Sequence, residues 1–219
     1  MTRPVRVPQE QLRPYLLEAP HPRYRHPDAL PTAPTLLSWP TLFGNDHPVE
    51  IEVGFGKGRF LIESAQARPT FDFLGIEIER KYAMETAARV ASRSLKNVRV
   101  TCTEALWFLR TYVPGRSVAA VHVYFPDPWW KRKHKKRKLF TADFARETAR
   151  ILRPDGALHF ATDVAEYYEQ TLAMLREQGL FVESPGGEDV VIATNFEAKY
   201  RLEGRPIHRT RLEKAKDQG

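Results

Sequence analysis

The stretch that decides the fold is VEIEVGFGKG, from Val49 to Gly58. Its first five residues are typical of a buried strand, and glycines then follow at every second position, at Gly54, Gly56 and Gly58. Glycine allows a tight turn from strand to helix and lets the backbone approach a ligand closely. Because ligands of open α/β sheets bind outside the carboxyl ends of the strands, the stretch predicts both a sheet and a binding site at its edge.

Strands and helices are expected to alternate about five times from this stretch onward. Besides 49–53, strands are expected at 71–78, 97–102, 117–125 and 157–162. Helices are expected at 58–68, 80–94, 104–113, 142–152 and 164–178, with a turn at 153–156 and two further segments at 180–184 and 206–212. This alternation predicts a parallel α/β sheet with right-handed crossovers.

The chain is expected to divide at residue 48 into an N-terminal arm, 1–48, and one domain, 49–219. The arm contains ten of the 17 prolines, and proline removes backbone donors and interrupts both helices and sheets. We therefore expect the arm to be mostly irregular, with the hydrophobic residues between Leu36 and Phe43 anchoring its end to the core.

The positive charge of the chain is concentrated in one place. The formal net charge is +7, and seven of the eight residues from Lys131 to Lys138 are lysine or arginine, so the rest of the protein is neutral overall. Such a local run indicates a polyanionic partner, either nucleic acid or an anionic membrane.

Cysteine usage and hydropathy favour a cytoplasmic protein. Cys102 is the single cysteine, which excludes an internal disulfide and, without a cluster of histidines and cysteines around it, makes a metal site unexpected. The N-terminus lacks the apolar stretch of a signal peptide, and no apolar run is long enough to span a bilayer.

Acidic residues flank the glycine loop. Glu52 precedes Gly54 by two positions, and Glu77 follows it by 23, near the spacing at which an acid accepts hydrogen bonds from ribose hydroxyls. Dinucleotide-binding proteins favour G-x-G-x-x-G, whereas E-x-G-x-G-x-G resembles the first motif of the class I S-adenosylmethionine-dependent methyltransferases. A tight turn without a ligand is the alternative for the glycines alone.

A second motif, FPDPWWK, follows the fourth expected strand. Pro126 and Pro128 restrict the backbone on both sides of Asp127. If this strand lies beside the first, Asp127 and the neighbouring tryptophans, Trp129 and Trp130, come close to the glycine loop. A carboxylate with aromatic rings suits a nucleobase site. A rigid turn with a solvated aspartate and tryptophan anchors is the alternative.

Several motifs together resemble the bacterial tRNA (guanine-N7)-methyltransferase family. They are EVGFGKG, GIE, YFPDPWWKRKHKKRKL, ATD and TNFEAKYRLEG, in this order. The resemblance implies a Rossmann-like class I methyltransferase fold, with a mostly parallel seven-stranded sheet flanked by helices and an antiparallel last strand. It implies transfer of a methyl group from S-adenosyl-L-methionine to N7 of a guanine in the variable loop of tRNA, guanine-46.

The resemblance also implies roles for individual residues. The cofactor would contact Glu52, Gly54, Gly56, Gly58, Glu77, Glu104 and Asp127, although the family usually carries Asp or Asn where Glu104 stands. Asp127 would also be the residue of the active centre. Substrate would contact Lys131, Asp163, Thr194, Asn195, Phe196 and Glu197, and RNA would contact Lys133, His134, Lys135, Lys136, Arg137 and Lys138. Asp163 with Glu166, and Thr194 with Glu197, could instead be helix-capping pairs.

Other functions remain open at this point. The protein could be a methyltransferase that acts on another RNA atom or on an exocyclic amine. Enzymes of the latter kind use a related motif after the fourth strand, but the prolines on both sides of Asp127 and the basic run that follows favour the N7 enzyme. A non-catalytic RNA-binding protein with a degenerate methyltransferase fold would not bind the cofactor. A nucleotide-dependent oxidoreductase is disfavoured by the glycine spacing. The sequence leaves the choice between a monomer and a homodimer open.

Overall fold

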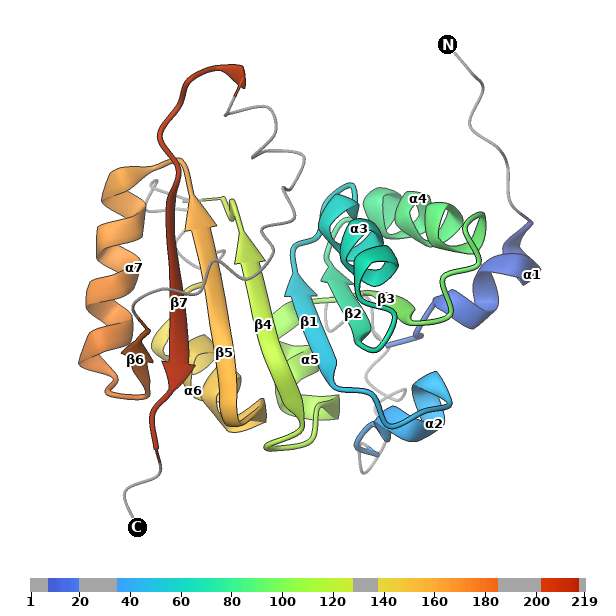
Figure 1. Ribbon diagram of the computed structural model, residues 1–219, viewed down its shortest axis with the longest axis horizontal. Helices are drawn as coiled ribbons and strands as arrows, with labels where there is room; N and C mark the ends of the chain where they lie inside the picture. The colour runs from blue at the N-terminus through green and yellow to red at the C-terminus, as the bar shows by residue number, and fades with distance from the viewer. Residues whose placement is uncertain (1–7, 20–34, 128–137, 185–201, 217–219) are drawn as a thin grey trace, which may run out of the picture.

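The computed structural model describes residues 8–19, 35–127, 138–184 and 202–216. Within these residues the strands form a seven-stranded sheet of order β3-β2-β1-β4-β5-β7-β6 (Figure 1). The strands are β1 (Val49–Val53), β2 (Asp72–Glu77), β3 (Val98–Cys102), β4 (Val118–Tyr124), β5 (Leu152–Thr162), β6 (Phe181–Glu183) and β7 (His208–Lys214). β1 to β5 are parallel, and β7 runs antiparallel to both β5 and β6. The expected fold, including the antiparallel last strand, is confirmed.

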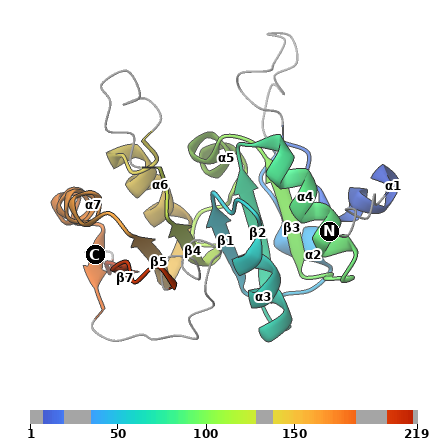
Figure 2. The ribbon, with the colours of Figure 1, turned by 90° about the horizontal axis from the view of Figure 1, so that it is seen from above.

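Helices cover both faces of the sheet (Figure 2). α3 (Arg59–Ala67) and α4 (Arg80–Ala91) lie on one face, and α5 (Ala105–Tyr112), α6 (Ala142–Ile151) and α7 (Ala165–Glu177) lie on the other. Two apolar cores result, one around Phe73 and Leu61 under α3 and α4, the other around Phe108, Phe144 and Phe160 under the remaining helices. β1 and β2 are buried at every position, and β4 at all but its last, because both faces of the sheet are covered there.

The turn expected at 153–156 takes a different form. These residues belong to β5, but the pairing jumps from Val118↔Leu152 to Ala120↔Ala157. The chain therefore bulges out between Leu152 and Ala157 and returns to the same pairing, so the proline and glycine of this segment interrupt the ladder without ending the strand.

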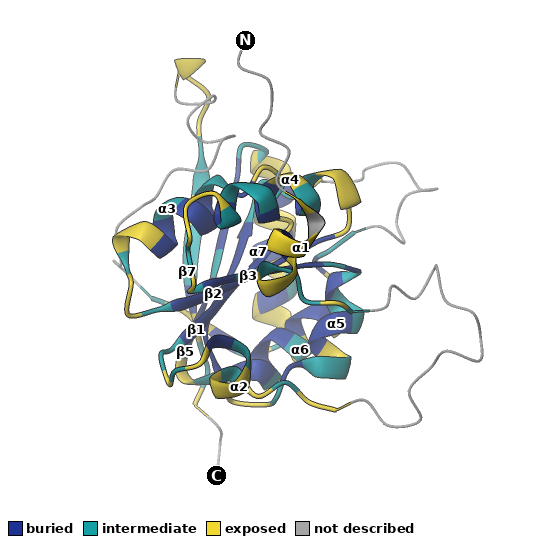
Figure 3. Ribbon diagram, turned by 90° about the vertical axis from the view of Figure 1, so that its right-hand side faces the viewer, coloured by how far each residue is buried: buried dark blue, intermediate teal, exposed yellow. Residues whose placement is uncertain are grey.

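Part of the N-terminal arm is regular and docked. α1 (Gln9–Leu12) and the 3-10 helix η1 (Arg13–Tyr15) bring buried Leu12 against the α4 side of the domain, and the Leu17 N–H donates to the Val100 carbonyl at 2.9 Å. α2 (Trp39–Phe43) buries Phe43 beside the Arg99 guanidinium. Figure 3 shows α1 as a largely exposed helix above the buried strands. The division at residue 48 stays a prediction.

No helix among the described residues is long and apolar enough to cross a membrane.

Candidate functional site

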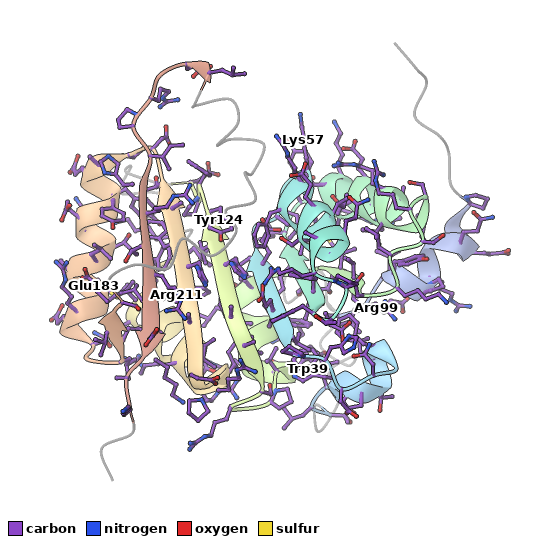
Figure 4. All side chains as sticks on the ribbon, viewed as in Figure 1. Trp39, Lys57, Arg99, Tyr124, Glu183 and Arg211 are labelled. Carbon is purple, nitrogen blue, oxygen red and sulfur yellow. The ribbon has the colours of Figure 1, made fainter. Side chains whose placement is uncertain are left out.

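The first and fourth strands are neighbours, as the sequence predicts. β1 pairs with β2 on one side and with β4 on the other, so the strand order reverses between β1 and β4. Open α/β sheets bind ligands outside the carboxyl ends of their strands at such a switch point. Figure 4 places Lys57 of the glycine loop and Tyr124 at the end of β4 along this carboxyl edge.

All three loop glycines have left-handed backbone conformations. The φ angles of Gly54, Gly56 and Gly58 are +75°, +50° and +65°, which other residues adopt only with strain. A Cβ on Gly58 would lie 2.3 Å from the Thr86 side chain, so this glycine lets α3 and α4 pack. Among the described residues, nothing lies within 4 Å of a Cβ built on Gly54 or Gly56, so the backbone there is open to a ligand.

The loop is also held by side chains that are distant in sequence. Glu77, at the end of β2, is buried and accepts hydrogen bonds from the N–H groups of Gly56 and Glu79, each at 2.9 Å. The Arg89 guanidinium of α4 donates to the Lys57 carbonyl. Glu77 therefore shapes the loop, and a carboxylate has lone pairs left for a ligand hydroxyl.

Glu52 is the unusual group of this edge. Its side chain is buried, and its Oε2 has no hydrogen-bond partner among the described residues. Burial and the charge of Glu77 raise the pKa of Glu52 to about 8, although a backbone hydrogen bond from Leu61 lowers it. A buried carboxyl group with an unused oxygen suits a cationic ligand, because pairing with a cation offsets the cost of ionising it.

Glu104 has a structural role at the start of α5. It is the N-cap residue, and its two carboxylate oxygens accept hydrogen bonds from the N–H groups of Leu106 (3.0 Å) and Trp107 (2.7 Å). Capping satisfies donors that the first helical turn leaves free. Contact between Glu104 and a cofactor stays a prediction.

Asp127 follows β4 at the same edge and is exposed. The chain reaches it through Phe125, whose φ is +51°, and Pro126. Burial raises the pKa of Tyr167 in α7 to about 12, and the negative charge of Asp127 adds a smaller upward effect. A hydrogen bond with Thr171 lowers this pKa. Asp127 therefore lies close enough to α7 for its charge to act on Tyr167.

Asp163 does not cap α7. The N-cap residue is Val164, without a side-chain cap, and its N–H donates to the Thr162 hydroxyl at 3.3 Å. The Asp163 carboxylate instead forms an ion pair with Arg205, which precedes β7. The capping interpretation of Asp163 with Glu166 is therefore wrong, because an arginine 42 positions further along the chain takes the carboxylate.

A buried polar network under the end of β4 was not predicted. Arg68 donates to both oxygens of Glu50, at 2.7 and 2.8 Å, and His122 bridges Glu50 Oε2 and the Tyr124 hydroxyl at 2.9 Å each. Burial raises the pKa of Glu50, but His122 and Arg68 outweigh it and hold this pKa at about 2. The His159 ring stacks on that of His122. Burial and, to a smaller extent, the charge of His122 lower the pKa of His159 to about 3. The available signal was polar residues at alternate positions of otherwise apolar strands, Glu50 and Glu52 in β1 and His122 and Tyr124 in β4.

Many predicted substrate contacts lie outside the described residues. These are Lys131, Lys133, His134, Lys135, Lys136, Arg137, Thr194, Asn195, Phe196 and Glu197, together with Trp129 and Trp130. Lys138 is described and half-buried. No group of three or more His, Cys, Asp or Glu side chains in the described part of the chain could hold a metal ion.

Comparison with known proteins identifies the family. A family described as "Putative methyltransferase" matches residues 46–210. The tRNA (guanine-N(7)-)-methyltransferase of Rhodopirellula baltica is 40% identical over 188 residues, which cover 80% of this chain and 69% of the relative. The enzyme of the same name from Geobacillus thermodenitrificans is 34% identical over 177 residues, which cover 78% of this chain and 82% of the relative. The chain belongs to the tRNA (guanine-N7)-methyltransferase family.

Solved structures of other methyltransferases share the fold of this chain. A methyltransferase described as SAM-dependent, from Aquifex aeolicus, superposes with a TM-score of 0.54 at 14% identity, covering 80% of this chain and 87% of that one. A 30S ribosomal A1408 methyltransferase from an uncultured bacterium gives a TM-score of 0.56, also at 14% identity, covering 80% and 91%. At these identities the likeness concerns the fold alone.

Proposed function

We propose that this member of the tRNA (guanine-N7)-methyltransferase family transfers a methyl group from S-adenosyl-L-methionine to N7 of a guanine in tRNA. One observation carries the proposal. The open glycine loop lies at the switch point, where Glu52 Oε2 has no hydrogen-bond partner among the described residues and where β4, the strand that leads to Asp127, pairs with β1.

The residues of this edge fit the cofactor. Glu52 can pair with the cationic methionine end, and Gly54 and Gly56 leave room for the ligand against their backbone. Glu77 keeps the loop in shape through the Gly56 N–H and would accept hydrogen bonds from the ribose hydroxyls. When bound, S-adenosyl-L-methionine supplies an electrophilic methyl group on a sulfonium.

Guanine N7 carries a lone pair at neutral pH, so the acceptor needs no general base. In methyl transfer, N7 would bond to the methyl carbon as the carbon–sulfur bond breaks, S-adenosylhomocysteine would leave as a neutral thioether, and the positive charge would pass to the guanine ring. The protein must align the two partners, near 3 Å apart. We assign Asp127 the role of accepting hydrogen bonds from guanine N1–H and N2–H₂ and of stabilising this charge.

We further propose that the acceptor is the guanine at position 46 in the variable loop of tRNA. The basic run ending at Lys138 would bind the tRNA backbone, and Lys131, Asp163 and residues 194–197 would contact the substrate. Each phosphate contact should add about 0.7–0.9 to the slope of log K against log salt. We propose a cytoplasmic location, where tRNA is available, and a monomer or a homodimer.

The decisive experiment incubates the protein with a labelled methyl donor and unmodified tRNA and then maps the methylated nucleoside. We expect 7-methylguanosine at one variable-loop position. If the methyl group is found on another RNA atom, guanine N7 is not the acceptor and the protein is a methyltransferase of different specificity. If calorimetry detects no binding of S-adenosyl-L-methionine, a non-catalytic RNA-binding protein becomes the better description.

A further inference from the structure

The backbone of Phe125 is in a conformation that its side chain disfavours. Three non-glycine residues in the described part of the chain have positive φ angles, namely Ser94 (+52°), Arg116 (+55°) and Phe125 (+51°). Ser94 follows the end of α4, and Arg116 lies in the loop that leads into β4. Phe125 alone among the three immediately follows a strand at the switch point, two residues before Asp127.

Two separate effects oppose this conformation. A left-handed backbone brings the Cβ of any L-residue close to the following carbonyl oxygen, and bulky residues rarely adopt it. The residue before a proline is also driven towards extended φ and ψ values, because the proline ring collides with its backbone, and Pro126 follows here. Such strain persists only where the surrounding structure holds it, and it is concentrated at functional sites.

Contacts on the entry side of the turn fix the position of the Phe125 amide. The Phe125 N–H donates to the Ala161 carbonyl at 2.8 Å, directly after the pairing of Tyr124 with Ala161. The Tyr124 hydroxyl is in turn tied to His122 and, through it, to Glu50. Because β4 is fixed up to the Phe125 amide, the φ angle of Phe125 is the first free rotation that decides where the chain leaves the sheet.

We propose that the left-handed conformation of Phe125 positions Asp127 for methyl transfer. An extended Phe125 would continue the direction of β4, whereas the left-handed angle turns the chain before Pro126 and sets the exposed carboxylate at the carboxyl edge. Phe125 is a positioning residue that acts through Asp127. The inference rests on the proposed function, because it assumes that Asp127 serves the acceptor guanine.

The test compares two matched pairs of variants. Phe125→Gly and Phe125→Ala both lose the ring, but only glycine adopts the left-handed angle without strain. Phe125→Asn and Phe125→Leu have side chains of similar size, and asparagine tolerates this angle far better than leucine. We expect turnover within about threefold of wild type for Gly and Asn, and about 10- to 100-fold lower for Ala and Leu, since small displacements of catalytic groups cost this much. Affinity for S-adenosyl-L-methionine should be the same in all four.

Thermal stability provides a readout that does not depend on activity. Phe125→Gly should melt about 2–4 °C above Phe125→Ala, opposite to the order expected where the backbone is unstrained. If Ala and Gly are equally active and Ala is the more stable, Phe125 acts only through its ring and the proposal is overturned. Loss of activity in Asp127→Asn together with equal turnover in all four Phe125 variants would likewise reject it, while leaving the proposed function intact. If the wild type methylates no tRNA, the proposed function fails instead, and the order of melting temperatures still decides whether Phe125 is strained.

Discussion

The two sides of the switch point are built differently. On the side of β1 and β2, Glu52 and Glu77 are buried, and the glycine loop is held by backbone and side-chain hydrogen bonds. On the side of β4 and β5, the carboxylate of Asp127 is exposed and is reached through a strained turn. Under the proposed function, the side that would hold the cofactor relies on buried carboxyl groups, whereas the side that would hold the acceptor guanine relies on the position of an exposed carboxylate.

The largest expected effect comes from the acceptor side. Asp127→Asn preserves shape but removes the negative charge, so turnover should fall about 100- to 1,000-fold, the loss typical of removing one electrostatic contact with a transition state. Affinity for S-adenosyl-L-methionine should change little if the two sides are independent. Single-turnover methylation of tRNA and calorimetry measure the two effects. Full turnover with normal tRNA affinity would remove Asp127 from the active centre.

On the cofactor side, Glu52→Gln should weaken binding of S-adenosyl-L-methionine about 10- to 100-fold, since a buried charge-assisted contact is lost.

The Glu52→Gln change should also raise the melting temperature of the cofactor-free protein at pH 8.5. The folded pKa of Glu52 is about 8 against an ordinary 4.5, so between these values the unfolded chain releases a proton that the folded protein keeps, and stability falls as pH rises.

Glutamine cannot ionise and avoids this loss. Differential scanning calorimetry at pH 5 and pH 8.5 should therefore show a larger gain for Glu52→Gln at the higher pH. The same gain at both values would mean that Glu52 is not held neutral by burial.

A smaller effect concerns the pH dependence of cofactor binding. If Glu52 ionises when it pairs with the cationic end of S-adenosyl-L-methionine, binding releases up to one proton between about pH 5 and 8. Affinity should then rise with pH, by at most about tenfold per pH unit, and level off above pH 8. Calorimetry in two buffers with different ionisation enthalpies measures the released proton. Glu52→Gln is the control and should release none.

The smallest effect is expected at Glu104, where variants can separate capping of α5 from contact with the cofactor. Glu104→Ala removes the cap of α5 and should lower stability by about 1 kcal/mol, equivalent to a drop of about 2–4 °C in melting temperature. Glu104→Asp keeps an N-cap side chain and should restore most of that stability. If Ala weakens cofactor binding well beyond what Asp does at equal temperature below melting, Glu104 also contacts the cofactor.

Prediction from the sequence succeeded where the signal is local. The strand at 49–53, the glycine loop and the order of elements are confirmed, because strand and helix periods and turn residues act over a few positions. The local alternative of a helix cap at Asp163 is wrong, because the structure pairs its carboxylate with Arg205. Prediction from the sequence also missed the network of Arg68, Glu50 and His122, whose members come from α3's end, β1 and β4.

The sequence by itself determined which groups stand at the carboxyl edge: three glycines after one strand, and an aspartate after another. Only the tertiary structure decided their physical state. Burial by neighbouring elements raises the pKa of Glu52, and Phe125 takes its positive φ angle directly after β5 has fixed its amide. Backbone preferences are short-range and can be read along the chain, whereas desolvation and cross-strand hydrogen bonds depend on residues that folding brings together.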